Sequence, residues 1–135
     1  MAEALPPTRA HPLSPHLSIW RWHVTMAASI LHRLTGVALY GAALVLAGWL
    51  LALASGPRAY GEFMGLLSSL AGKVVLFGVT VSLFFHLLNG IRHLGWDMGQ
   101  GFAPGTANAT AWGAMLLAIA AAAGVWIAAA MGGGA

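Results

Sequence analysis

The sequence predicts an all-α integral membrane protein with three transmembrane helices. Three observations support this: 59% of the 135 residues are hydrophobic, only 7% are charged, and three long stretches carry no charge. An ordinary soluble domain has about a quarter charged residues, so this composition excludes a cytosolic enzyme and a disordered chain. The net charge of +3 is too small for a nucleic-acid surface, and the lack of Cys excludes disulfides and Cys-ligated metal sites.

The apolar stretches define the helices in order. The charge-free runs cover residues 34–54, 74–91 and 109–131. Each run approaches or exceeds the ~20 residues that a helix needs to cross the hydrocarbon core. Strands are excluded because the runs lack period-2 alternation. With their flanking residues, the runs predict helices over about 24–54, 63–95 and 107–131.

The remaining residues predict the domain organisation and topology. We expect an N-terminal cytoplasmic segment over residues 1–22 and a single three-helix membrane domain over 23–135. Ser55-Gly56-Pro57-Arg58 interrupts the chain after the first helix, and residues 99–106 do so after the second. Four Arg residues fall on the N-terminal side of the membrane and two positive residues on the other, which favours a cytoplasmic N-terminus.

Ionisable residues at membrane depth indicate function, and they form two clusters. Ser29, His32 and Arg33 stand at positions i, i+3 and i+4 of the first helix and share one face. A second stripe with the same period closes the second helix: His86, Asn89, Gly90, His93 and Asp97. Because consecutive helices run in opposite directions, both clusters are expected near the N-terminal face of the membrane.

His86 is the most informative of these residues. It lies about two turns inside the second helix, too deep for so short a side chain to reach the interface. A buried neutral imidazole beside a small residue such as Gly90 suits an axial ligand of haem iron, and it suits a structural hydrogen bond equally well. The residues alone leave both interpretations open. His93 lies ~10 Å further along the helix, within reach of a haem propionate or another anion.

A haem ligated by two His residues needs a second chain. The second helix has one His at ligand depth and the third helix has none. Three helices also bury a cofactor poorly. We therefore expect the chain to form half of a two-subunit haem-binding helical bundle.

Two motifs resemble those of a known family. The first combines residues 12–20 (PLSPHLSIW) with residues 29–36 (SILHRLTG). The second, residues 86–97 (HLLNGIRHLGWD), fits the pattern H-x-x-x-G-x-R-H-x-x-x-D. On these motifs the chain resembles the succinate dehydrogenase cytochrome b subunits, which are membrane anchors of complex II, over nearly its whole length. His11 and Trp20 replace an Arg and a Tyr that are common in the family, away from both clusters.

The resemblance implies a role for each matching residue. His86 matches the axial ligand of haem b, whose other axial His comes from a second membrane anchor subunit. Ser29 and Arg33 match residues that line the ubiquinone site. Positions near the haem propionates or the quinone are matched by His32, Arg92 and His93.

The resemblance also implies the setting of the chain. A flavoprotein subunit with FAD oxidises succinate, and an iron–sulfur subunit passes the electrons to ubiquinone in the membrane. This chain would bind haem b and ubiquinone and anchor the complex in the lipid bilayer, with no succinate site, no catalytic residue of its own and no nucleic acid. The N-terminal residues lack a signal-peptide pattern, which favours the bacterial inner membrane over the mitochondrial inner membrane.

Two alternatives remain. A haem-free structural or assembly subunit would use the polar stripe only to hold helices together. In that case Ser29→Ala and Arg33→Leu would weaken assembly and leave quinone reduction intact. A di-haem anchor that works with menaquinone would need about four intramembrane His ligands. The one clear ligand, His86, disfavours that arrangement.

Overall fold

The computed structural model describes residues 18–132, which form four helices and no strand. In chain order the helices are α1 (Val24–Ala54), α2 (Pro57–Ser68), α3 (Leu70–Asp97) and α4 (Pro104–Gly132). Helices α1, α3 and α4 are long and apolar enough to cross a membrane, which confirms the all-α fold with three transmembrane helices. Most of the predicted N-terminal segment, with residues 12–17 of the first motif, lies outside the described residues.

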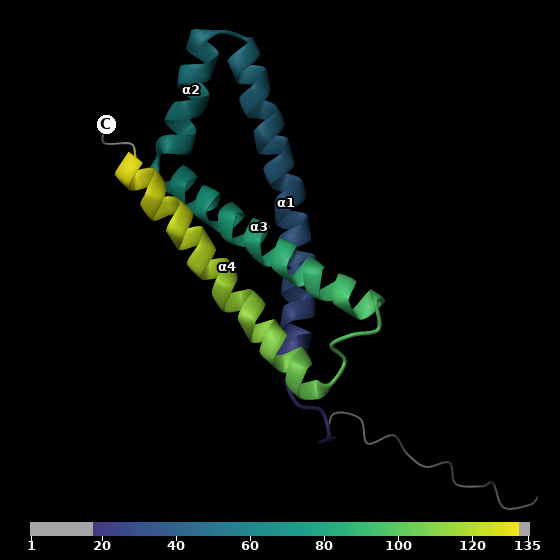
Figure 1. The fold of residues 1–135 in the computed structure, drawn as a ribbon. Helices are drawn as coiled ribbons and strands as arrows, with labels where there is room; N and C mark the ends of the chain where they lie inside the picture. The colour runs from purple at the N-terminus through teal and green to yellow at the C-terminus, as the bar shows by residue number, and fades with distance from the viewer. Residues whose placement is uncertain (1–17, 133–135) are drawn as a thin grey trace, which may run out of the picture.

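The long helices are arranged as a pair and a crossing helix. Helices α3 and α4 lie side by side, and the N-terminal half of α1 crosses α3 (Figure 1). Helix α1 contacts α4 as well, near the start of both helices. The two clusters predicted from the sequence lie on α1 and α3, so this crossing determines which of their side chains meet.

The second helix differs from the range expected from the sequence. Residues 63–95 were expected to form one helix, but the chain turns at Ser69, and the separate helix α2 precedes α3. The backbone of Ser69 is extended, and its Oγ accepts a hydrogen bond from the Gly72 N–H at 3.1 Å. This N-cap satisfies one of the free donors at the start of α3. Helix α2 begins with Pro57 at a position where its missing N–H costs nothing.

The corner between α2 and α3 depends on Gly72. A Cβ atom there would lie 2.5 Å from the carbonyl oxygens of both Leu66 and Leu67, which are backbone atoms and cannot rotate away. We expect Gly72→Ala to destabilise the protein by about 1–3 kcal/mol. The clash with the two carbonyl oxygens outweighs the ~1 kcal/mol by which a helix prefers Ala to Gly. Thermal unfolding of the purified protein in detergent measures this effect.

Gly78 on the same helix provides the matched control, because a Cβ atom there meets nothing within 4 Å. Gly78→Ala should unfold at or above the wild-type temperature. Equal unfolding temperatures for the two variants would show that the corner tolerates a side chain.

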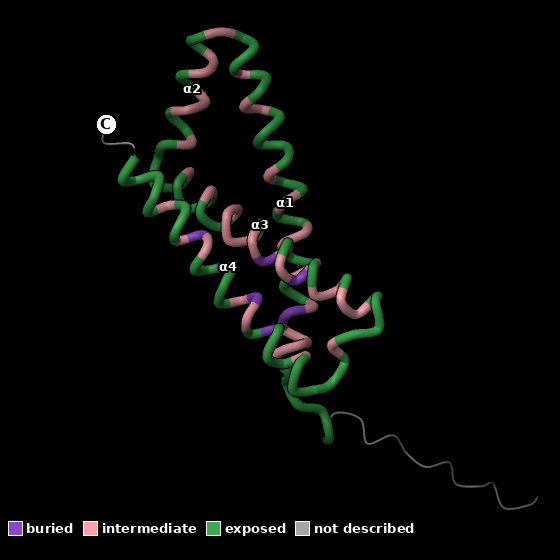
Figure 2. The backbone as a smooth tube through the Cα atoms, in the orientation of Figure 1, coloured by how far each residue is buried: buried purple, intermediate pink, exposed green. Residues whose placement is uncertain are grey.

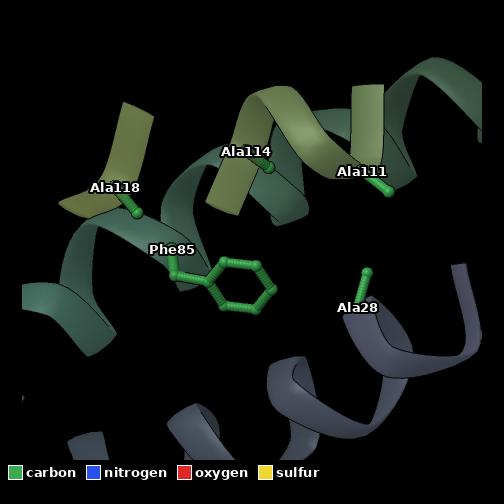
Figure 3. Close-up of a cluster of buried hydrophobic side chains, with 5 residues drawn as sticks. All are labelled: Ala28, Phe85, Ala111, Ala114 and Ala118. Carbon is green, nitrogen blue, oxygen red and sulfur yellow. The ribbon is translucent and has the colours of Figure 1, made fainter. Parts of the chain in front are cut away.

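The buried core is small and consists mainly of alanine. Ala28 from α1, Phe85 from α3 and a row of Ala residues on α4 meet where the three long helices approach one another (Figures 2 and 3). The row that meets them comprises Ala111, Ala114 and Ala118, and Ala122 one turn further along α4 is also buried. Small side chains allow helix backbones to approach closely, which is how helices associate in lipid. This packing fixes the rotation of α3 relative to α1.

Large apolar side chains cover the outer faces of the long helices. Leu34, Val37 and Tyr40 on α1 are more than half exposed, as are Trp112 and Leu116 on α4. Between α1, α2 and the first half of α3 lies an apolar hollow of about 1170 Å³. Such surfaces are stable only against lipid or another membrane chain.

Candidate functional site

The site lies at the crossing of α1 and α3. His86 on α3 faces Gly36 on α1, where a Cβ atom would lie 3.2 Å from Cε1 of the imidazole. That distance is shorter than most contacts of real Cβ atoms, so glycine makes room for the ring. The close approach of the two backbones places the His86 ring against the turn of α1 that precedes Gly36 and contains His32 and Thr35.

Two hydrogen-bond partners on α1 orient His86. Its Nδ1 lies 3.2 Å from the carbonyl oxygen of His32 and 3.2 Å from Oγ1 of Thr35. A carbonyl oxygen can only accept, so Nδ1 carries the proton and donates it. The Thr35 hydroxyl is held in turn by the Leu31 and His32 carbonyls, at 2.8 and 3.0 Å. In the neutral imidazole this leaves the lone pair on Nε2.

Three imidazole rings gather around this point. The His32 ring stacks on His86 with centroids 3.9 Å apart and planes inclined by 9°. The His93 ring lies 5.1 Å from His32, centroid to centroid. Nδ1 of His32 is buried and has no hydrogen-bond partner within residues 18–132. We call His32, His86 and His93 the His cluster.

Arg92 points away from the His cluster, toward α4. Its Nε donates to Thr110 Oγ1 at 3.0 Å, one terminal nitrogen donates to the Ala107 carbonyl at 3.0 Å, and the other donates to Asn89 Oδ1 at 3.3 Å. The guanidinium carbon also lies 4.0 Å from the centroid of the Trp96 ring. All three guanidinium nitrogens thus have partners within the chain.

Ser29 and Arg33 lie on α1 and do not join the His cluster. Arg33 is exposed, and its guanidinium has no ion-pair or hydrogen-bond partner in the described part of the chain. Ser29 is half-buried one turn earlier on the same helix. This pair offers a hydroxyl and a free cation at the outer surface of the bundle.

The structure thus divides the residues singled out from the sequence. It brings together His32, His86 and His93 and directs Arg92 to α4. Away from the His cluster, Arg33 is exposed and Ser29 is half-buried on α1. No three His, Asp or Glu side chains among the described residues are arranged to hold a metal ion by themselves.

Sequence reasoning assigned no individual role to three residues that shape the site. Thr35 and Gly36 belong to the first motif, and their spacing of three and four residues from His32 places them on its face of α1. Asn89 belongs to the polar stripe on α3 and is completely buried. The sequence showed the helical spacing of these three residues, but it did not show which side chains they contact.

Comparisons with known proteins identify the family. The sequence pattern of the succinate dehydrogenase/fumarate reductase transmembrane subunit matches residues 7–126. The succinate dehydrogenase cytochrome b556 subunit of Rickettsia felis is 45% identical over 101 residues, which are 75% of this chain and 78% of that protein.

Relatives from other organisms agree. The cytochrome b556 subunit of Paracoccus denitrificans is 38% identical over 90 residues, covering 67% of this chain and 69% of the relative. The mitochondrial cytochrome b560 subunit of Sus scrofa is 43% identical over 95 residues, covering 67% of this chain and 54% of the relative. This chain has three apolar helices, with the motif segments 29–36 on α1 and 86–97 on α3, and it belongs to the family of succinate dehydrogenase/fumarate reductase transmembrane subunits, as a cytochrome b membrane subunit.

Proposed function

We propose that this chain binds haem b and ubiquinone and passes electrons from the iron–sulfur subunit of succinate dehydrogenase to the quinone. One observation carries the proposal: His86 is held through Nδ1 at the crossing of α1 and α3, and its Nε2 has no partner within residues 18–132. The proposal goes further than the family assignment, because it names the side chains that would bind the haem and the quinone.

The residues at the crossing fit haem iron. With a proton on Nδ1, a neutral imidazole keeps its lone pair on Nε2, which is the atom that would ligate the metal. A hydrogen bond from the other ring nitrogen to a backbone carbonyl is the usual way in which a protein orients such a ligand. Haem supplies one-electron redox chemistry when bound. The other axial His would come from a second membrane anchor subunit.

His32 and His93 fit the surroundings of the haem propionates. The buried Nδ1 of His32 needs a partner that the described residues do not supply. A carboxylate beside the His cluster would satisfy that nitrogen with a charge-assisted hydrogen bond. Arg92 is left out of this assignment, because its three nitrogens already donate to α3 and α4.

Ser29 and Arg33 fit the quinone. A hydroxyl and a guanidinium one turn apart can both donate to a quinone carbonyl. As the quinone takes up electrons, negative charge develops on that oxygen, and a fixed cation stabilises it. Arg33 is free for this task, because no other group in the described part of the chain binds its guanidinium.

The partners and location follow from the same proposal. A second anchor subunit would cover part of the exposed apolar surface, and the iron–sulfur subunit would dock near the N-terminal face, with the FAD-carrying flavoprotein beyond it. The excess of Arg on the N-terminal side favours a cytoplasmic N-terminus in a bacterial inner membrane.

The test is the optical spectrum of the purified complex. A reduced-minus-oxidised spectrum should show a b-type band, with one haem for each copy of this chain, and the complex should reduce a soluble ubiquinone analogue with succinate. A complex that assembles without haem would instead support a structural or assembly subunit.

A further inference from the structure

Arg92 joins the end of α3 to the start of α4. Its hydrogen bonds to Thr110 and the Ala107 carbonyl tie α3 to the first turns of α4, and its bond to Asn89 runs along α3 itself. Asn89 is fully buried, so this part of the network is shielded from solvent and lipid. An Arg side chain with three engaged nitrogens holds a more defined geometry than a single hydrogen bond would.

Trp96 extends the network to the connection between α3 and α4. The Arg92 guanidinium lies over its ring, and the indole Nε1 donates to the Gly101 carbonyl at 3.2 Å. Gly101 has a φ of +81°, and a Cβ atom there would lie 3.6 Å from the indole. Arg92 and Trp96 therefore fix the path of this connection.

The same indole reaches the His cluster. The His93 ring contacts Trp96 edge to face, with centroids 4.9 Å apart and planes inclined by 86°. His93 in turn lies 5.1 Å from His32, which stacks on His86. The contacts from Arg92 to His86 thus pass through Trp96, His93 and His32 without a gap.

We propose that Arg92 is a positioning residue. By holding Trp96 and the start of α4, it fixes His93 against His32 and so sets the surroundings of the haem ligand His86. This inference rests on the proposed haem-binding function. Arg92 then acts on the haem site through Trp96 and His93, and it does not contact a haem propionate or the quinone itself.

A purely structural clamp between α3 and α4 is the competing explanation, and the chain contains a matched control for it. At the other end of the helix pair, Trp126 Nε1 donates to Thr80 Oγ1 at 3.2 Å. This bond also joins α3 to α4, but neither residue contacts the His cluster. Trp126→Phe removes it and keeps an aromatic ring.

The experiment compares Thr110→Val, Thr110→Ser and Trp126→Phe in the complete complex. Thr110→Val keeps the side-chain shape but leaves Nε of Arg92 without its partner, whereas Thr110→Ser keeps the hydroxyl. We expect Thr110→Val to load haem normally and to shift the haem midpoint potential clearly beyond the error of a redox titration, because groups around a ligand tune the metal. Thr110→Ser and Trp126→Phe should titrate as wild type.

Amide hydrogen exchange over residues 93–101 supplies a readout that does not require haem. Thr110→Val should accelerate exchange there roughly threefold to tenfold, the effect of losing about one hydrogen bond, while Trp126→Phe should not. An unchanged potential or unchanged exchange in Thr110→Val, or an equal effect of Trp126→Phe, overturns the positioning role. A wild-type complex without haem would refute the proposed function, and the exchange data would still decide whether Arg92 fixes this segment.

Discussion

A complex that carries His86→Leu is expected to assemble but to lose nearly all of its b-type absorbance. Leucine occupies a similar volume between α1 and α3, so the helix crossing with Gly36 is retained, but it offers no lone pair to iron. A tenfold or greater fall in haem for each complex is the expected result, measured from the reduced-minus-oxidised spectrum and from haem extraction. The loss is this large because His86 is the one ligand we assign to this chain.

His23 provides the control for this variant. It is exposed just before α1, and only its backbone carbonyl takes part in the start of that helix. His23→Leu should keep full haem content. If His86→Leu also kept full haem, the ligand would have to be another side chain, and the hydrogen bonds of His86 to α1 would be structural.

Arg33→Leu should cost about 100-fold or more in kcat/KM for quinone reduction while leaving the haem content unchanged. The expected size follows from removing one strong donor to a developing oxyanion, which costs about 10²–10³ in rate in other enzymes. Arg33→Lys should have a kcat/KM between those of the wild type and Arg33→Leu, because lysine keeps the charge but loses the planar fork of donors. The measurement is succinate-driven reduction of a soluble quinone analogue by the purified complex.

Arg58→Leu removes the same charge at the opposite end of the bundle. Arg58 forms an exposed ion pair with Glu62 at 3.1 Å, an interaction worth little in solvent. Its substitution should leave quinone reduction at the wild-type rate. Wild-type quinone reduction by Arg33→Leu, together with weaker assembly, would favour the structural-subunit alternative.

The fold was largely predictable because its main signals are local. Charge-free runs long enough to cross a bilayer identify α1, α3 and α4 without knowledge of their packing. The separate helix α2 was not predicted, because an apolar run cannot reveal that the chain turns at Ser69. That turn depends on a side-chain cap and on the close approach of Gly72 to the preceding carbonyl groups.

The candidate site was predictable only in part. Helical spacing placed His86 and His93 on one stripe of α3, and the structure adds His32 by stacking it on His86. Arg92 belongs to the same motif, but its position i+6 from His86 turns it toward α4 rather than α1. Spacing along one helix predicts which residues share a face, but it does not predict which neighbouring helix that face contacts.

The sequence by itself determined that this protein spans a membrane with three helices and carries two polar clusters at the same depth. Hydropathy and helical period are properties of each segment alone, so no tertiary information was needed. Only the tertiary structure decided that Thr35 and the His32 carbonyl hold His86 and that Arg92 binds α4. It also left the Arg33 guanidinium without a partner among residues 18–132. The reason is physical: helix rotation and crossing are set by the packing of Phe85 with alanines from two other helices, and no single segment contains that information.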